Sequence, residues 1–228
     1  IMQGGLADNA TVHSWLGVKS GLQAAKSGHD AIMSPYSHLY FDGYQADPKI
    51  EPMAIGYWVP LDSVYAFEPV HPDLNTTEAR HILGAQANLW TEFIGTEDYL
   101  EYMVFPRMAA LAEINWTPKT AKDFDDFKGR LAVQYQRYDR QGINFRVPVP
   151  LIQTKLNADS TVTVSLADPT KSSVIRYTTD GSEVNVQSPV YQQPLVLQKS
   201  KTIRYSLFFN NKRKSSTDYF PKPVKKSK

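Results

Sequence analysis

From Thr11 to Trp116 the chain alternates between short apolar stretches and amphipathic ones. Residues 11–15 (TVHSW) have the alternation of a strand, and residues 17–28 (GVKSGLQAAKSG) predict a helix that closes at Gly28. Residues 30–35 (DAIMSP) predict a second short strand. A strand, a helix and a strand this close together form a βαβ unit, so the two strands are expected to be parallel.

A third apolar segment, residues 82–90, predicts another strand after a long insertion rich in Pro, Tyr and Gly at about residues 36–73. Thr96 then caps a predicted helix. Pro106 lies inside that helix and should kink it, because proline removes a backbone donor. The apolar face of the predicted helix consists of Leu100, Met103, Val104, Met108, Leu111 and Ala112.

A second long helix is predicted at residues 121–142 (AKDFDDFKGRLAVQYQRYDRQG), ending near Gly142. Its apolar stripe consists of Phe124, Phe127, Leu131, Tyr135 and Tyr138. The stiff segment at residues 147–150 (VPVP) predicts a linker after it.

From about Leu151 the hydrophobic period changes from that of a helix to that of a strand. Apolar side chains alternate in three segments, and Asp180-Gly181 is a hairpin turn signal. These features predict a small antiparallel β-sandwich. The side chains expected to face its core are Val162, Val164, Leu166, Ile175, Tyr177, Ile203, Tyr205 and Leu207.

Three parallel strands with two helical crossovers do not make a whole domain. A (β/α)8 TIM barrel takes roughly 250 residues, so we expect an α/β fold formed by the C-terminal part of such a barrel, with its eighth strand in residues 83–90. The predicted domains are residues 1–118 (barrel part), 119–146 (helical connector) and 147–228 (β-sandwich). Because "IMQGGLADNA" begins in mid-loop without Met, we expect a longer parent polypeptide.

Composition narrows the choice of partners and cofactors. The net charge of +2 is too small to favour nucleic acid or a membrane surface as a partner. The basic tail at residues 222–228 is expected to be a solvated terminus. The chain has no Cys, and its five His residues show no i, i+4 pair, so we expect no metal and no cofactor. No apolar run approaches 18 residues, so no membrane span is expected.

Aromatic and acidic residues follow the predicted strands. In TIM barrels the chemistry lies at the C-terminal ends of the strands, and these ends read HSW, SPYSHLYFD and NLWTE. An indole stacks on the apolar face of a sugar, and a carboxylate accepts hydrogen bonds from its hydroxyls. The sequence therefore predicts a carbohydrate pocket, whose candidate residues are Trp15, Tyr40, Asp42, Trp58, Trp90 and Glu92.

Three motifs resemble the family 20 glycoside hydrolases, the β-N-acetylhexosaminidases. "GAQANLWTE…YLEYMVFPRMAALAEINW" and "SPYSHLYFD" resemble the closing strands of their barrel, and "GGLADNATVHSW" resembles the loop and sixth strand. The resemblance covers residues 4–116. "IRYTTDGSEV…SPVY" further resembles the chitobiase-type C-terminal sandwich found in many of these enzymes.

The resemblance implies a retaining, substrate-assisted mechanism. In the family, the 2-acetamido oxygen of the substrate attacks the anomeric carbon, so these enzymes depart from the two-carboxylate scheme. An Asp-Glu pair on the fourth strand orients the acetamido group and supplies the general acid. No segment of this chain matches that pair, so we expect it upstream of Ile1 and expect the chain alone to be inactive. The family also implies a periplasmic or secreted location.

The same resemblance implies a role for each candidate residue. Tyr40 would hydrogen-bond the acetamido oxygen, Asp42 would bind a sugar hydroxyl near the 6-position, and Glu92 would grip the 4- and 6-hydroxyls. Trp90 would be the floor under the sugar, and Trp15 a wall of the acetamido pocket. Trp58 lies in a loop that aligns only to within about two residues, so its neighbour Tyr57 is nearly as good a candidate.

Simpler structural roles stay open for these residues. Trp90 and Tyr40 could pack in a core, Asp42 could form a turn before Gly43, and Glu92 could favour the helix that follows it. Arg107 is expected to be structural. Two further functions remain alternatives: a non-catalytic carbohydrate-binding or scaffold protein, and an ordinary two-carboxylate glycosidase that uses Asp42 and Glu92. The identity of the sugar, its linkage and the oligomeric state are left open by the sequence.

Overall fold

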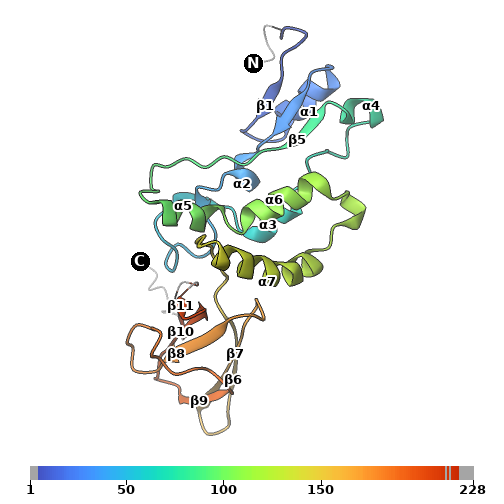
Figure 1. Ribbon diagram of the computed structural model, residues 1–228. Coiled ribbons are helices and arrows are strands. Elements are labelled where there is room, and N and C mark those ends of the chain that lie inside the picture. The colour runs from blue at the N-terminus through green and yellow to red at the C-terminus, as the bar shows by residue number, and fades with distance from the viewer. Residues whose placement is uncertain (1–4, 214, 216, 221–228) are drawn as a thin grey trace, which may run out of the picture. The chain divides into compact units, whose positions relative to one another are not determined.

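The computed structural model describes residues 5–213, 215 and 217–220 (Figure 1), so the predicted basic tail lies outside the described residues. The chain divides into two compact units. Unit 1 comprises Ile1–Phe127 and Gln141–Phe145, and unit 2 comprises Lys128–Arg140 and Arg146–Lys228. Helix α7 (Phe124–Arg140) therefore contributes residues to both units.

Unit 1 contains a parallel three-stranded sheet in the order β1-β2-β5, formed by β1 (Val12–Ser14), β2 (Ala31–Met33) and β5 (Ile82–Ala85). Helix α1 (Lys19–Lys26) connects β1 to β2, and its Ala24 packs with Val12 and Ala31 in the core. The helix ends at Lys26, and Gly28 follows its C-cap residue Ser27 with a φ of 81°, which suits glycine. The predicted βαβ unit is confirmed.

The segment between β2 and β5 is folded into short elements. These are α2 (Tyr36–Leu39), β3 (Gly43–Tyr44), β4 (Ile55–Trp58), α3 (Leu61–Ala66) and α4 (Thr76–Ala79). Strands β3 and β4 pair in parallel, and Asn75 caps α4 with a complete capping box. The insertion predicted from its Pro, Tyr and Gly content is thus an ordered part of unit 1.

The predicted third strand is too long. Strand β5 ends at Ala85, because Gly84 has a φ of 137° and the pairing with β2 shifts register nearby. Beyond it, only an isolated bridge between Asn88 and Tyr40 continues the parallel pairing in the described part of the chain. Trp90 therefore lies in the loop after the strand, with about half of its surface exposed.

The predicted kinked helix is two helices, α5 (Glu97–Val104) and α6 (Arg107–Trp116). Phe105 between them is extended, because a residue before proline is pushed out of the helical region. The predicted apolar face does not run across the break, since Leu100 and Met108 are exposed whereas Arg107 is buried. Thr96 is the N-cap of α5, as expected, and accepts a hydrogen bond from the Tyr99 N–H.

The 3-10 helix η2 (Lys119–Ala121) precedes α7. Of the predicted stripe on α7, Phe127, Leu131, Tyr135 and Tyr138 are buried. Asp123 caps its start by accepting hydrogen bonds from the N–H groups of Asp125 and Asp126. This helix follows its sequence pattern closely.

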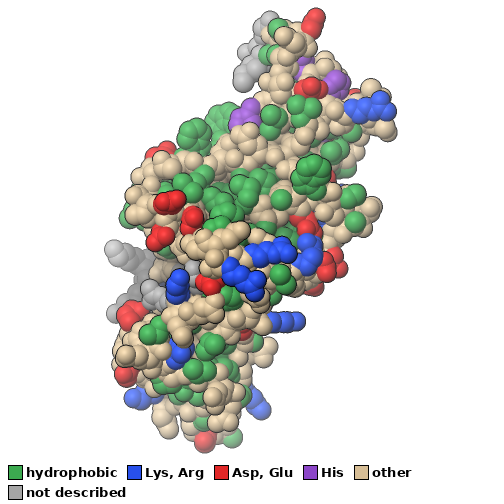
Figure 2. Space-filling view, in the orientation of Figure 1, with side chains coloured by type: hydrophobic (Ala, Val, Ile, Leu, Met, Phe, Trp, Pro, Cys, Tyr) green, Lys and Arg blue, Asp and Glu red, His purple; other side chains and the backbone are tan. Residues whose placement is uncertain are grey.

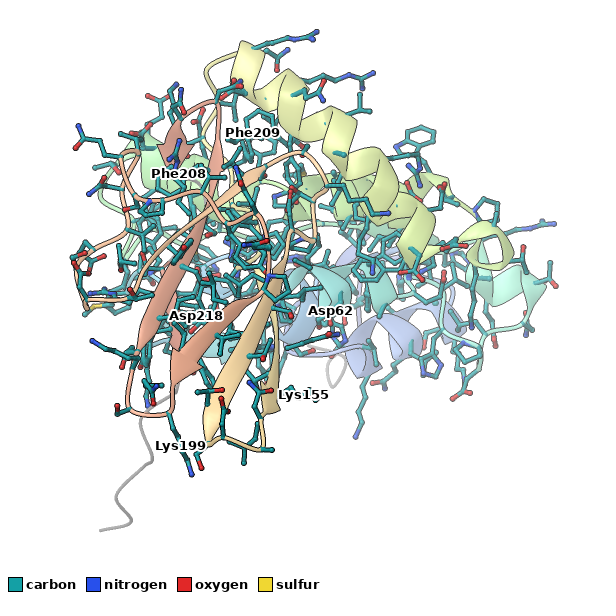
Figure 3. The ribbon with its side chains drawn as sticks, turned by 90° about the horizontal axis from the view of Figure 1, so that it is seen from below. Asp62, Lys155, Lys199, Phe208, Phe209 and Asp218 are labelled. Carbon is teal, nitrogen blue, oxygen red and sulfur yellow. The ribbon has the colours of Figure 1, made fainter. Side chains whose placement is uncertain are left out.

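Unit 2 contains two small antiparallel sheets. One has the order β6-β7-β9 and consists of β6 (Leu151–Leu156), β7 (Thr161–Ala167) and β9 (Leu195–Gln198). In the other, β10 (Ile203–Phe209) pairs with β8 (Val174–Thr178), β11 (Lys212–Arg213) and β12 (Asp218–Phe220). Figure 3 shows Phe208 and Phe209 toward one end of these sheets and Lys155 and Lys199 toward the other.

The core of unit 2 contains most of the predicted inward side chains: Val164, Leu166, Ile175, Ile203, Tyr205 and Leu207 are buried. One local prediction is wrong, and one segment is more packed than expected. Asp180-Gly181 forms a turn, but no strand follows it directly, and the chain returns beside β8 only at Val190. The predicted linker at residues 147–150 is partly packed, since Val147 and Pro150 are buried.

Candidate active site

The loops after the three parallel strands of unit 1 are joined to one another by backbone hydrogen bonds. The Tyr36 N–H donates to the Trp15 carbonyl at 2.9 Å, which links the loop after β1 to the start of α2. The Phe41 N–H donates to the Asn88 carbonyl at 2.7 Å, which links the end of α2 to the loop after β5. Residues far apart in sequence are thereby gathered at the carboxyl ends of the strands.

Three tyrosines form an aromatic cluster at this place. The ring centroids of Tyr36, Tyr40 and Tyr57 lie 6.0–6.5 Å apart in edge-to-face pairs. Such contacts are favourable, and they hold each ring at a defined angle. In Figure 2, hydrophobic side chains (green) gather around α2, and acidic ones (red) lie over α5.

Asp42 is a buried carboxylate beside this cluster, with 4% of its surface exposed. Its Oδ2 accepts a hydrogen bond of 2.7 Å from the Tyr57 hydroxyl, and its Oδ1 is buried with no hydrogen-bond partner in the described part of the chain. Burial raises the pKa of Asp42, and the charge of Glu92 raises it further, whereas the Tyr57 bond and Arg107 oppose the change. An unpaired buried oxygen is costly, so this one is suited to accept a hydrogen bond from a ligand.

Glu92 lies on the exposed loop after β5, close enough for its charge to raise the pKa of both Asp42 and Tyr57. The structure therefore brings Tyr40, Asp42, Tyr57 and Glu92 into one site. Two carboxylates of like charge and a group of aromatic rings form an environment that can accept hydroxyl donors and stack on an apolar ring face.

The three candidate tryptophans are each about half exposed: Trp15 48%, Trp58 52% and Trp90 55%. Trp15 and Trp90 lie on loops that reach the site through the backbone bonds described above. Trp58 lines a shallow pocket with Pro60, Asp62, Ser63, Tyr65, Ala66 and Phe124, and no other candidate residue lines it. Because neighbouring residues of a strand face opposite sides, Tyr57 and not Trp58 is directed at Asp42.

Arg107 is fully buried and joins α6 to the segments that carry the site. Its guanidinium donates to the carbonyls of Phe41 and Gly43, on either side of Asp42, and to the Val59 carbonyl at 2.8 Å. The same group lies 4.7 Å from the centroid of the Phe41 ring. One side chain thus fixes the backbone around Asp42 and the end of β4.

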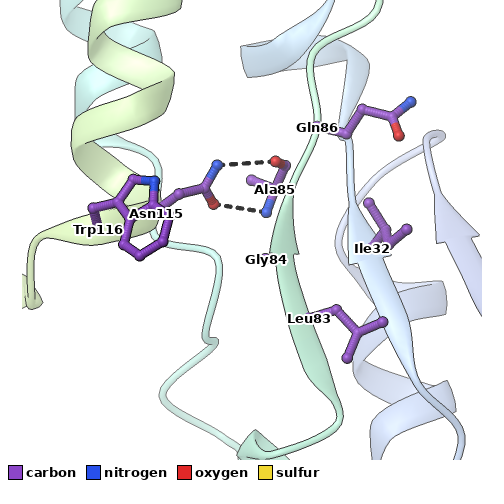
Figure 4. Close-up of a pocket in the computed structure, with 7 residues that line it drawn as sticks. All are labelled: Ile32, Leu83, Gly84, Ala85, Gln86, Asn115 and Trp116. Carbon is purple, nitrogen blue, oxygen red and sulfur yellow. Dashed lines mark hydrogen bonds between the residues drawn. The ribbon is translucent and has the colours of Figure 1, made fainter.

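A separate open pocket lies beside β5 (Figure 4) and is lined by Ile32, Leu83, Gly84, Ala85, Gln86, Asn115 and Trp116. The Asn115 side chain accepts from the Ala85 N–H at 2.8 Å and donates to its carbonyl at 3.0 Å. An amide side chain therefore satisfies backbone groups at the open edge of the strand. None of the candidate sugar-binding residues lines this pocket.

Similarity to known proteins decides the family. A model described as "Glycosyl hydrolase family 20, catalytic domain" matches residues 1–119, which is more than half of the chain. The chain belongs to glycosyl hydrolase family 20. A second model, "Chitobiase/beta-hexosaminidase C-terminal domain", matches residues 155–219.

Relatives in the family are longer than this chain. A beta-hexosaminidase of Porphyromonas gingivalis is 42% identical over an alignment of 203 residues, which covers 86% of this chain and 26% of that protein. A beta-N-acetylhexosaminidase of Cellulomonas fimi is 33% identical over 123 residues, or 54% of this chain and 24% of that one. The chain thus spans about a quarter of the length of these curated relatives.

Solved structures of the family resemble more than half of the chain. The exo β-N-acetylglucosaminidase of Vibrio harveyi, in complex with N-acetylglucosamine, has a TM-score of 0.54 and 30% identity, covering 62% of this chain and 22% of that one. The β-N-acetylhexosaminidase of Streptomyces coelicolor has a TM-score of 0.54 and 28% identity, covering 61% and 29%.

Two residues at the site of this family 20 chain are not among the candidates that the sequence indicates. Tyr36 precedes Tyr40 by one helical turn and shares its face. Arg107 is expected from the sequence to be structural, and the structure shows that the backbone it supports is that of the site. A lone arginine inside an otherwise apolar helix pattern is the available signal.

Among the described residues, no group of three or more His, Cys, Asp or Glu could hold a metal.

Asp42→Asn should change how stability depends on pH. A carboxyl whose pKa is raised in the native state makes the free energy of unfolding fall as the pH rises from below the unfolded pKa through the native one. An asparagine side chain cannot ionise, so we expect the variant to gain stability relative to wild type between about pH 3 and pH 7. Thermal unfolding followed by tryptophan fluorescence measures this, with the exposed Asp8→Asn as the control. An equal stability difference at both pH values would contradict it.

Proposed function

We propose that this chain supplies one side of the −1 sugar pocket of a β-N-acetylhexosaminidase. The whole enzyme removes terminal β-linked N-acetylglucosamine or N-acetylgalactosamine with retention, by the substrate-assisted mechanism. The observation that carries the proposal is the buried Asp42 with one unpartnered oxygen among the described residues, beside Tyr40 and Glu92, at the strand ends of a family 20 chain.

In this proposal β1, β2 and β5 are the last three strands of a TIM barrel, and the pocket lies at their carboxyl ends. The order and parallel pairing of these strands support it. The general acid Glu and its Asp partner belong to a strand upstream of Ile1. The chain therefore holds the sugar and its acetamido group but does not protonate the leaving group.

Each residue has a proposed role in the pocket. Tyr40 donates to the acetamido oxygen and positions it as nucleophile, Asp42 accepts from a sugar hydroxyl near the 6-position, and Glu92 accepts from the 4- and 6-hydroxyls. Trp90 forms the floor under the ring, and Trp15 a wall. Trp58 remains a proposed wall residue, and the bond between Tyr57 and Asp42 supports Tyr57 as the alternative.

The proposed partner is a glycan that ends in N-acetylhexosamine, encountered in the periplasm or outside the cell. Among the described residues, no helix is both long and apolar enough to cross a membrane. No observation favours a sandwich that binds sugar by itself. The large exposed apolar side chains described in unit 2 are Val133, Leu151, Leu156, Val174, Val186, Val190 and Val196, which are all aliphatic and lack a face for stacking.

The test compares the full-length product of the gene with the 228-residue chain. We expect the full-length protein to hydrolyse an aryl N-acetyl-β-glucosaminide and the chain alone to show no turnover, because it lacks the general acid and its sheet has open edges. Turnover by the isolated chain would refute the proposal that the general acid lies outside this chain. Equal cleavage of an aryl β-glucoside that lacks the acetamido group would instead indicate a two-carboxylate glycosidase.

A further inference from the structure

We propose that Tyr57 is a positioning residue that orients the carboxylate of Asp42, so that Oδ2 is held by the protein and Oδ1 is left to accept one hydroxyl of the ligand. This inference rests on the proposed function, because it takes the ligand to be a sugar. It assigns to Tyr57 a role that does not require contact between Tyr57 and the substrate.

The first observation is that the two carboxylate oxygens of Asp42 have different surroundings. The Tyr57 hydroxyl donates to Oδ2 at 2.7 Å, whereas Oδ1 is buried without a partner in the described part of the chain. A hydrogen bond to one oxygen fixes the rotation of the carboxylate plane, and so fixes the direction in which the other oxygen points. A ligand donor then meets an acceptor that is already aligned, which avoids the entropy cost of ordering it.

The second observation is the fit of the Tyr57 ring against the backbone next to Asp42. A Cβ atom placed on Gly43 would meet the Tyr57 ring at 2.6 and 2.8 Å, closer than real side-chain carbons come. Glycine at position 43 therefore allows the ring to lie where its hydroxyl reaches Asp42. Tyr36 and Tyr40 contact the ring in edge-to-face pairs and help to hold it there.

Backbone contacts hold the two residues in register. The Ile55 N–H donates to the Asp42 carbonyl at 3.1 Å, which ties β4 to the Asp42 segment. Arg107 of α6 donates to the carbonyls before and after Asp42 and to the carbonyl after Trp58. The bond between Tyr57 and Asp42 thus joins two segments that are already fixed by other bonds.

The charged and titratable groups that face Asp42 come from three elements. Tyr57 on β4 donates to it, Glu92 after β5 repels its charge, and Arg107 on α6 attracts it. Glu92 and burial favour the protonated form of Asp42, which accepts less well, while Tyr57 and Arg107 favour the ionised form. Removing the Tyr57 hydroxyl should therefore both loosen the carboxylate and raise its pKa.

The experiment uses three variants. Tyr57→Phe removes the donor, and Gly43→Ala displaces the intact Tyr57 ring. Tyr99→Phe is the matched control, because it also removes a tyrosine hydroxyl that donates at 2.7 Å, in this case to the Met53 carbonyl and not to Asp42. In the 228-residue chain, carbon-13 NMR of the Asp42 carboxyl, assigned with Asp42→Asn, gives its pKa in each variant.

We expect the pKa of Asp42 to rise in Tyr57→Phe and in Gly43→Ala and to stay at the wild-type value in Tyr99→Phe. In the full-length enzyme, Tyr57→Phe should lower kcat/KM by about tenfold, as expected for the loss of one bond to a charged group. It should also move the acid limb of the pH profile of kcat/KM to higher pH. Tyr99→Phe should leave both within about twofold.

An unchanged Asp42 pKa in both Tyr57→Phe and Gly43→Ala would overturn the inference, whatever the enzyme does. If the full-length wild type cleaves no N-acetylhexosaminide, the proposed function fails, while the NMR comparison still decides whether Tyr57 orients Asp42. A loss of kcat/KM without a shift of the acid limb would assign Tyr57 a purely structural role and also overturn the inference.

Discussion

Arg107→Met is expected to lower the free energy of unfolding of unit 1 by roughly 3–5 kcal/mol. The guanidinium is fully buried and donates to four backbone carbonyls, those of Phe41, Gly43, Val59 and Met103. Methionine fills a similar volume but supplies no donor, so these acceptors lose their bonds away from water. The segments that carry Asp42 and Tyr57 should separate from α6 as a result.

The measurement can be confined to unit 1. All four tryptophans of the chain, Trp15, Trp58, Trp90 and Trp116, lie in that unit, so tryptophan fluorescence during urea unfolding reports on it alone. The exposed Arg80→Met is the control and should change stability by less than about 0.5 kcal/mol. Arg107→Lys should recover only a small part of the loss, because an ammonium cannot reproduce the planar fork of donors. A wild-type unfolding midpoint in Arg107→Met would show that the carbonyls find other donors.

Local patterns in the sequence are sufficient to predict the first two parallel strands and the helix between them. The βαβ unit of β1, α1 and β2 depends on residues close in sequence, and a glycine marks the end of its helix. Because parallel strands end at one edge, the sequence also places Tyr40, Asp42 and Glu92 near one another. The charge of Glu92 acting on Asp42 agrees with that placement.

The contacts that organise the site could not be predicted in the same way. Tyr57 and Asp42 are 15 residues apart, and Arg107 bonds to a carbonyl 64 residues away. Which of Tyr57 and Trp58 faces Asp42 depends on strand register, and a slip of one residue reverses the two faces. The alternation pattern alone does not fix that register, whereas the hydrogen bond does.

The predicted ends of the third strand and of the helix through Pro106 are wrong, because a hydrophobic pattern can continue where the backbone changes conformation. The apolar run at residues 82–90 predicts one strand, yet β5 ends at Ala85, and Leu89 beyond it is half-buried in a loop. Apolar residues in a loop that contributes to a pocket wall look the same in sequence as those of a buried strand. Similarly, the helix pattern continues through Pro106, although the backbone before a proline leaves the helix.

Glu92→Gln in the full-length enzyme is expected to lower kcat/KM by about 30- to 5,000-fold. This corresponds to a loss of roughly 2–5 kcal/mol of transition-state stabilisation. Glutamine keeps the shape of the side chain but loses the charge, so the proposed bonds to the sugar hydroxyls become neutral ones. These bonds form in the ground state and strengthen in the transition state, so KM should rise and kcat should fall together. The exposed acid Glu97, at the first turn of α5, gives the matched control Glu97→Gln, which should stay within about twofold.

The same variant has a second readout that needs no substrate. The charge of Glu92 raises the pKa of Asp42, so Glu92→Gln should lower it, opposite in sign to the effect expected of Tyr57→Phe. A lowered Asp42 pKa with unchanged kinetics would mean that Glu92 is near the pocket but does not grip the sugar. Reduced kcat/KM in both Glu92→Gln and Glu97→Gln would point instead to a general effect of negative charge on the approach of the substrate, because charge around a binding cleft acts on association as a field and not through one contact.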